Sequence, residues 1–187
     1  MEDSTRPLNL EADLLVIGWG KAGKTLARDL ASHGRHVVLV ERDDAMIGGT
    51  CINVACVPTK TLVNLAERRG DRNPDEYLKQ AIASRDSLID RLRAANKAML
   101  SGQETVTLVH GEARFTGHRR IRVRAGEETL DITAGAVVVN TGTSPLMPDV
   151  PGIQGRFVYD STTIQHIADG RVPHTLTIVG GGVIGLG

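Results

Sequence analysis

The sequence is poor in aromatic residues and in net charge, and each shortage limits what the protein can be. Phe, Trp and Tyr make up 3% of the chain, so the core implied by its 41% hydrophobic content must be built from Val, Ile, Leu and Ala. The 22 basic and 22 acidic residues cancel. A nucleic acid or an anionic membrane surface would favour a basic chain, so neither is expected as a partner.

Long apolar runs are also missing. No stretch is long enough to span a bilayer, and the first residues are acidic and polar rather than an apolar signal segment. We therefore expect a cytoplasmic protein. In that compartment a disulfide is more often catalytic than structural.

Alternating strand and helix signals predict an α/β fold that opens with a βαβ unit. Residues 1–11 are expected to form a flexible lead. The apolar runs Ala12–Ile17 and His36–Val40 are typical of buried parallel strands. Between them, Leu and Ala recur on one face of a helix expected from about Lys21 to Ser32.

Two helices and a group of short strands follow. The first helix is expected from Cys56 or Val57 to about Arg69, with Pro58 in its first turn. The second starts at the capping pattern Asn73-Pro74-Asp75-Glu76 and ends near Ser101-Gly102. Period-two patterning then predicts an antiparallel meander of four strands: Thr105–Val109, Glu112–Phe115, Arg119–Arg124 and Glu128–Ile132.

The last third of the chain returns to buried strands. Ala136–Val139 and Thr175–Val179 are apolar runs of strand length, and the segment between them is rich in Pro and Gly at its start. We expect a first domain over residues 12–145, a connector over 146–174 and the start of a second domain over 175–187.

A glycine pattern marks the junction of the first strand and helix. Gly18, Gly20 and Gly23 form G-x-G-x-x-G, which permits a tight turn, a close approach of the backbone to a pyrophosphate and close helix–strand packing. The helix N-terminus adds N–H groups and a favourable dipole. Glu41 ends the second strand, where an acid binds ribose hydroxyls. Together these features predict dinucleotide binding.

A second interpretation uses the same residues. Gly18 to Thr25 also satisfy G-x-x-x-x-G-K-[ST], the P-loop of nucleoside triphosphatases, with Lys24 on the phosphates and Thr25 on magnesium. Such an enzyme would need an acidic magnesium ligand at the end of a buried strand. The later strand ends in Asn140-Thr141-Gly142 instead, and Glu41 suits a ribose better.

The two cysteines of the chain both lie between residues 48 and 60. Four residues separate Cys51 from Cys56, which differs from the spacing of a thioredoxin motif. A zinc site would need further ligands at characteristic spacings, and the six histidines do not provide them, so no metal is expected. Because the pair follows a nucleotide-binding pattern, it suggests a redox-active disulfide beside a flavin.

The residues around the cysteines resemble a known family. The run Gly48-Gly49-Thr50-Cys51-x-Asn53-x-x-Cys56-Val57-Pro58-x-Lys60 is similar to the active-site signature of the class I pyridine nucleotide–disulfide oxidoreductases. Glutathione reductase, dihydrolipoamide dehydrogenase and mercuric reductase are members. The flanking Gly-Lys-Ala-Gly-Lys-Thr-Leu-Ala and Pro-Thr-Lys-Thr-Leu-Val most resemble the bacterial reactive-chlorine-resistance flavin reductases.

The resemblance implies a Rossmann-like FAD-binding domain with a parallel sheet and a small antiparallel meander, followed by the truncated start of a second Rossmann domain. It implies that electrons pass from NADH or NADPH to FAD, then to the disulfide, then to a small-molecule substrate. Cys56 would be the thiolate that faces the flavin, Cys51 the thiol that attacks substrate, and Lys60 a cation at the flavin ring. A helix N-terminus at Cys56 would lower the pKa of its thiol.

The resemblance also assigns the cofactor contacts. Thr50 would touch the FAD pyrophosphate and Ala113 would meet the adenine through its backbone. The full set of expected cofactor-binding residues is Gly18, Gly20, Lys21, Ala22, Gly23, Glu41, Arg42, Gly49, Thr50, Lys60, Ala113, Thr141 and Gly142. The sequence departs from the family at Ala55, where Gly is usual, at Val183, where many members have Tyr, and at Gly187, where Glu normally pairs with Lys60.

A second glycine motif, made of Gly180, Gly182 and Gly185, follows the last predicted strand. A binding unit needs its helix and second strand, so we expect this motif to bind nothing in this chain. Family members continue into further domains, so the resemblance implies an inactive fragment of a homodimeric parent. A free-standing, non-catalytic FAD-binding module is the alternative. The final electron acceptor stays open between a disulfide, a metal ion and an oxidised chlorine or thiocyanate species.

Overall fold

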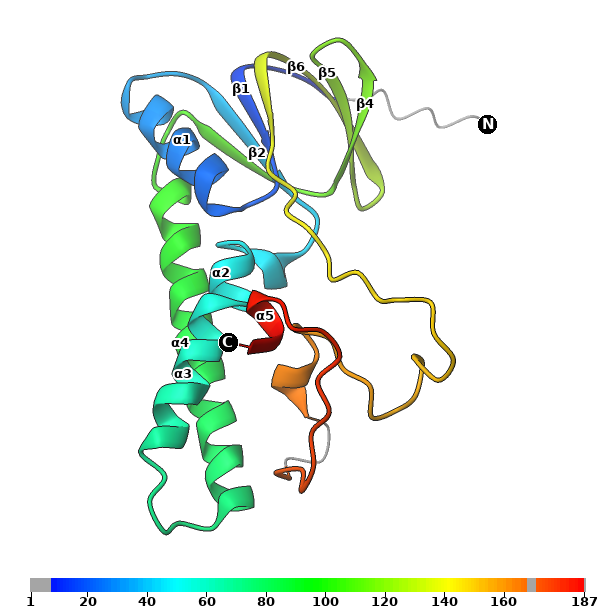
Figure 1. The fold of residues 1–187 in the computed structure, drawn as a ribbon. Coiled ribbons are helices and arrows are strands. Elements are labelled where there is room, and N and C mark those ends of the chain that lie inside the picture. Colours follow the sequence, from blue (N-terminus) through cyan, green and yellow to red (C-terminus); the bar gives the residue numbers. More distant parts are fainter. Residues whose placement is uncertain (1–7, 168–170, 187) are drawn as a thin grey trace. The chain divides into compact units, whose positions relative to one another are not determined.

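The computed structural model describes residues 8–167 and 171–186 and has an α/β fold, as predicted (Figure 1). The strands are β1 (Leu8–Ile17), β2 (Val37–Glu41), β3 (Val106–His110), β4 (Glu112–Gly117), β5 (Arg120–Ala125) and β6 (Glu128–Val139). The helices are α1 (Lys21–Ser32), α2 (Thr50–Asn53), α3 (Cys56–Glu67), α4 (Pro74–Ser101) and α5 (Val183–Leu186), with 3-10 turns η1 (Asp44–Met46) and η2 (Ile164–His166).

The chain divides into two compact units. One holds residues up to Asn53 together with Arg91–Thr143, and so contains the sheet, α1, α2 and the last turns of α4. The other holds Val54–Asp90 and the residues from Ser144 onward, and so contains α3, most of α4, η2 and α5. The domain boundaries expected from the sequence remain a prediction.

The first unit is organised by a six-stranded sheet of order β3-β2-β1-β6-β5-β4 (Figure 1). β1 lies between β2 and β6 and is parallel to both, whereas β4, β5 and β6 are joined by antiparallel pairing. Chain order therefore reverses on the two sides of β1. In open α/β sheets this switch point, at the carboxyl ends of the strands, is where ligands bind.

Three strand predictions in the first unit need correction. β3 is not part of the antiparallel meander, because it pairs parallel with β2, with Val37 opposite Val106. Glu128–Ile132 and Ala136–Val139 are one continuous strand, β6. β1 begins at Leu8 and pairs with β6 from its first residue, so residues 8–11 belong to the sheet and not to a flexible lead. Residues 1–7 lie outside the described residues.

Residues 14–16 of β1 and 37–40 of β2 are buried on both faces of the sheet, which explains their continuous apolar runs. Leu14 and Val16 of β1 belong to one core cluster, to which α1 contributes Ala27 and α4 contributes Leu100. The intervening Leu15 belongs to a second cluster on the opposite face, because side chains alternate along a strand. The other buried members of that cluster are Val38, Val40, Ile121, Val123, Ile132 and Ala134.

The helix predictions are confirmed, with small shifts at the ends. α1 and α4 span the expected ranges, and α3 ends two residues early, at Glu67. The side chain of Asn73 caps α4, since its Oδ1 accepts hydrogen bonds from the backbone N–H groups of Asp75 and Glu76 at 3.0 and 3.1 Å. No helix of the described residues combines the length and the apolar character that a membrane span requires.

The strand expected at Thr175–Val179 is not formed. These residues have no regular secondary structure, and the side chains of Leu176, Ile178 and Val179 are 61%, 57% and 89% exposed. A strand is stable only when a neighbour pairs with its backbone, and no described strand pairs with this segment.

Candidate functional site

The glycine loop after β1 packs against the segment that follows β6. A Cβ on Gly20 would lie 2.6 Å from the side-chain amide nitrogen of Asn140, and one on Gly23 would lie 2.5 Å from a methyl group of Val16. Gly18 has φ +98°, and a Cβ there would overlap the carbonyl oxygen of Asn140. A side chain at any of the three positions would collide with Asn140 or Val16, so the close packing expected of the glycine pattern is present, while the pyrophosphate contact stays a prediction.

Asn140 was not predicted as a site residue, although it links the two strands at the switch point. Its backbone N–H donates to Ile17 O at 2.8 Å, and its side-chain amide donates to Gly18 O at 3.3 Å. The signal in the sequence is its position at the end of a buried strand, directly before Thr141 and Gly142, which are predicted cofactor contacts.

The N-terminus of α1 has the features of an anion site. Gly20 is its N-cap residue and makes no side-chain cap, and the first turn carries no acidic residue. The first N–H groups of a helix have no partner within the helix, so a phosphate placed here would receive their hydrogen bonds and a favourable dipole. The predicted contacts of Lys21 and Ala22 lie in this first turn, and both side chains are exposed.

Glu41 organises the loop while keeping capacity for a ligand. Its Oε2 accepts a hydrogen bond from Trp19 N at 2.9 Å, and its Oε1 accepts from Arg42 N at 2.9 Å and Asp43 N at 3.1 Å. An ionised carboxylate offers about four acceptor sites, so one remains for a ribose hydroxyl after these three bonds. Gly111 N donates to Glu41 O at 2.8 Å, which joins the segment leading to Ala113 to the same end of β2.

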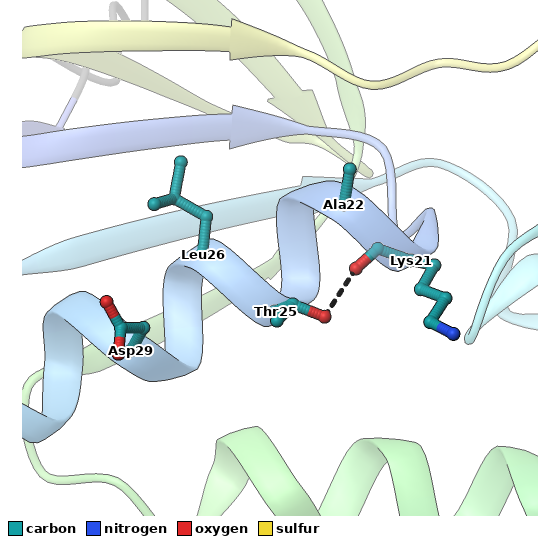
Figure 2. A pocket seen from close by; sticks show the side chains of 5 residues that line it. All are labelled: Lys21, Ala22, Thr25, Leu26 and Asp29. Atoms are coloured by element: carbon teal, nitrogen blue, oxygen red, sulfur yellow. Dashed lines mark hydrogen bonds between the residues drawn. The ribbon is translucent and has the colours of Figure 1, made fainter.

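The P-loop interpretation does not fit the geometry. A P-loop lysine reaches into its phosphate site, but Lys24 is buried and its amine donates to Gly48 O at 3.4 Å and to the side-chain oxygen of Asn96. The hydroxyl of Thr25 donates back to Lys21 O at 2.7 Å along α1, so it is engaged within the helix (Figure 2). Figure 2 shows this pair beside a shallow hollow on the surface of α1.

The first turn of α2 joins the glycine loop. Gly49 has φ +81°, and a Cβ there would lie 2.7 Å from the Cα of Gly20. A Cβ on Gly142 would lie 3.5 Å from the hydroxyl oxygen of Thr50. The structure thus brings together three separate segments of the chain that hold four of the predicted cofactor contacts: Gly20, Gly49 with Thr50, and Gly142.

The two cysteines are exposed thiols in the structure. Cys51 is the second residue of α2, in the first unit, and Cys56 is the first residue of α3, in the second unit. Lys60 lies one turn after Cys56 on α3 and is exposed. The helix-terminal position of Cys56 agrees with the prediction, whereas the disulfide and the roles of the three residues remain predictions.

Further residues hold the cysteine loop, and only the first of them had appeared in the predicted signature. Asn53 is buried and donates from its amide to Ile47 O at 3.0 Å and to Gly49 O at 2.9 Å. Arg93 of α4 donates to the side-chain oxygen of Asn53 at 2.7 Å. Arg93 and Asn96 belong to no recognisable motif, because they lie forty or more residues from the side chains that they bind, in a helix predicted from its capping pattern.

The second glycine motif forms a turn and the short helix α5. Gly180 has φ +113°, and a Cβ on Gly180 or Gly182 would meet nothing within 4 Å, unlike one on Gly18 or Gly20. The strand that should precede such a motif is absent from Thr175–Val179. Whether the motif binds a nucleotide stays a prediction. Gly187 lies outside the described residues.

Comparison with known proteins places the chain in a family. Residues 12–187 match the family described as pyridine nucleotide-disulphide oxidoreductase. The chain is 39% identical over 173 residues to a probable pyridine nucleotide-disulfide oxidoreductase, RclA, of Escherichia coli, covering 92% of this chain and 37% of that protein. It is 36% identical over 184 residues to a dihydrolipoyl dehydrogenase of Thermus scotoductus, covering 93% of this chain and 38% of that protein.

A mercuric reductase and a solved structure of a relative support the same family assignment. Over 183 residues the chain is 31% identical to the mercuric reductase of Staphylococcus aureus, covering 92% of this chain and 32% of that enzyme. The structure of the HOCl-induced flavoprotein disulfide reductase RclA from Escherichia coli, as its Cu(II) complex, superposes with a TM-score of 0.85 and 38% identity, over 94% of this chain and 38% of that one. The chain thus spans well under half the length of these relatives. It belongs to the pyridine nucleotide-disulphide oxidoreductase family and corresponds to the FAD-binding portion of these enzymes.

Proposed function

We propose that this chain is the part of a cytoplasmic, homodimeric flavin reductase that passes electrons from NAD(P)H, through FAD and the Cys51–Cys56 pair, to a small-molecule substrate. The observation that carries the proposal is the convergence of Gly20, Gly49 and Thr50. It supports the proposal because the loop that begins α2, and with it Cys51, lies next to the glycine loop where we expect the pyrophosphate to bind. A disulfide exchange with substrate is the chemistry that two cysteines at such a site can perform.

The residues present fit FAD. The uncapped N-terminus of α1 would hold the pyrophosphate, with Thr50 beside it, and Glu41 would accept a hydrogen bond from the ribose. Lys21, Ala22 and Arg42 would line the same stretch, and Ala113, Thr141 and Gly142 would complete the contacts. Bound FAD supplies a group that accepts a hydride from NAD(P)H and returns its two electrons.

The cysteines would receive those electrons. Reduction breaks the sulfur–sulfur bond and, with two electrons and two protons, leaves two thiols. The Cys51 thiolate would then attack an acceptor, and the Cys56 thiolate would displace the product and restore the disulfide. Cys56 starts α3, a helix of 12 residues. Lys60, one turn later, would stabilise negative charge at the flavin.

Counting electrons tests this function. We expect the FAD-loaded chain to take up two electrons more than the FAD-loaded Cys51→Ser variant in an anaerobic dithionite titration, because the variant has no disulfide to reduce. Loading can be followed through Trp19, the chain's single tryptophan, which lies between Gly18 and Gly20 and is buried in the core cluster next to the loop.

Cys56→Ser should behave as Cys51→Ser does, and both should bind FAD as tightly as the wild-type chain. Equal electron uptake by wild type and variants would contradict the redox role of the pair. It would favour the alternative of a non-catalytic FAD-binding module.

A further inference from the structure

Lys24 is a buried cation next to the loop that carries Cys51. It is 8% exposed, although lysine is almost never buried without a partner. Its amine donates to Gly48 O at 3.4 Å and to the side-chain oxygen of Asn96 on α4. Both acceptors are neutral, so these contacts anchor the amine without cancelling its charge.

The loop above Lys24 is rigidly held. Ile47, Gly48 and Gly49 are buried, and Asn53 binds the carbonyl oxygens of Ile47 and Gly49. Asn53 is itself held by Arg93, which lies three residues before Asn96 on α4. A single face of α4 therefore fixes both Lys24 and the loop, and Cys51 follows that loop by two residues.

Lys24 and Cys51 interact electrostatically. Burial lowers the pKa of Lys24 below its usual value, and the neighbouring cation Lys21 lowers it further, while the Coulomb interaction with Cys51 raises it. That interaction is mutual, so a charge on Lys24 favours the thiolate of Cys51. Two further cations lie at this cluster: Lys21 on α1, which lowers the pKa of Lys24, and Arg93 on α4, which binds Asn53.

We propose that Lys24 is a positioning residue for Cys51: its ammonium anchors the loop through Gly48 and Asn96 and supplies the positive charge that favours the Cys51 thiolate. The proposal rests on the proposed function, in which Cys51 attacks the substrate. The thiolate is the nucleophile in that step, so Lys24 would set the pH at which the site becomes reactive. The mechanism of attack itself would be unchanged.

The test is the pH dependence of alkylation of Cys51 by iodoacetamide, measured in the Cys56→Ser background so that one thiol reacts. We expect Lys24→Met to raise the pKa of the Cys51 thiol by roughly half a unit to one unit, as for one charge removed at short range. At a pH below that pKa, alkylation would be about three- to tenfold slower. Arg28→Met removes an exposed cation one turn further along α1 and should leave the pKa unchanged.

A second variant separates charge from anchoring. Asn96→Asp keeps an oxygen acceptor for Lys24 and adds a carboxylate that offsets its charge, so it should raise the pKa of Cys51 as Lys24→Met does. If either variant changes only the limiting rate at high pH, or leaves the alkylation pKa at the value found for Arg28→Met, Lys24 is merely structural and the proposal is wrong. The electron count is independent of this outcome, because it depends on the disulfide and not on the pKa of one thiol.

Discussion

At the scale of single residues, glycine serves two purposes at this site: it adopts positive φ angles, and it leaves room for close packing. Gly18 and Gly49 have positive φ, which side chains rarely tolerate, whereas Gly23 is an ordinary helical residue whose hydrogen faces Val16 and Asn140. Trp19, between these glycines, is buried, and its indole N–H has no partner among the described residues. The loop is thus shaped by packing as much as by backbone conformation.

Gly23→Ala tests the packing argument. Alanine is favoured over glycine in a helix by about 1 kcal/mol. A Cβ here would nevertheless lie 2.5 Å from Val16 and 2.7 Å from Asn140. We expect the cost of overpacking to exceed the gain in helix propensity, with a net loss of about 1–3 kcal/mol in the free energy of unfolding measured with urea.

Gly117→Ala is the matched control in the same unit, because a Cβ there would meet only Arg120, at 3.9 Å. Its free energy of unfolding should change by no more than about 0.5 kcal/mol. A Gly23→Ala variant as stable as wild type would show that α1 can move away from β1, and that close helix–strand contact is not what requires this glycine.

At the scale of elements, the segment predicted as a connector carries a structural role in the second unit. Arg85 of α4 is 0% exposed and donates to the backbone carbonyl of Gln165 in η2. Gln165 in turn donates from its amide to Val54 O at 2.9 Å, just before α3 begins at Cys56. A chain of hydrogen bonds therefore runs from α4 through η2 to the residue that precedes the N-cap of α3.

A capped turn leads into η2. The Asp160 carboxylate accepts hydrogen bonds from the Thr162 hydroxyl at 2.7 Å and from the backbone N–H groups of Thr162 and Thr163 at 2.8 Å. These bonds, with the Thr162 hydroxyl foremost, lower the pKa of Asp160 to about 2. Because the folded-state pKa is depressed, this stabilisation is present above the ordinary value of 3.8 and is lost as the pH falls through about 2.

Arg85→Met is expected to weaken the second unit. The substitution keeps much of the aliphatic volume but leaves the Gln165 carbonyl without its donor, at a cost of about 1–3 kcal/mol. Urea unfolding gives the loss, and hydrogen exchange of the α3 and η2 amides shows where it falls. Lys79→Met, which removes an exposed cation from the same helix, should leave the free energy of unfolding within about 0.5 kcal/mol of wild type. Equal stability of the two variants would mean that Arg85 does not hold η2.

At the scale of the whole molecule, the sheet of the first unit and the last residues of the chain differ in how far their apolar side chains are buried. The apolar residues of β2 and of the second half of β1 are buried on both faces of the sheet, whereas Leu176, Ile178 and Val179 are exposed despite their apolar character. Exposed apolar residues of this kind are typical of a surface that another element or molecule covers.

We expect the amides of Thr175–Val179 to exchange rapidly with solvent, because no strand among the described residues pairs with them. The amides of Leu14–Ile17, which pair with both β2 and β6, should be among the slowest to exchange and serve as the internal reference. Strong protection of Thr175–Val179 in a sample shown to be monomeric would contradict the structure at this segment. Protection that depends on protein concentration would instead indicate pairing between copies.

The sequence by itself determined the features that depend on neighbours along the chain. Helix limits follow from caps and periodicity, as at Asn73 and Ser101, and the glycine and cysteine motifs are recognisable because their members lie within a few residues of each other. Tertiary structure decided everything that depends on distant partners. It set the parallel direction of β3, the place of Asn140, the burial of Lys24 against Asn96 and the unpaired state of Thr175–Val179. The physical reason is that residues dozens of positions away decide which strand pairs with which, in which direction, and which group binds a buried charge. Local sequence patterns do not encode such distant partners.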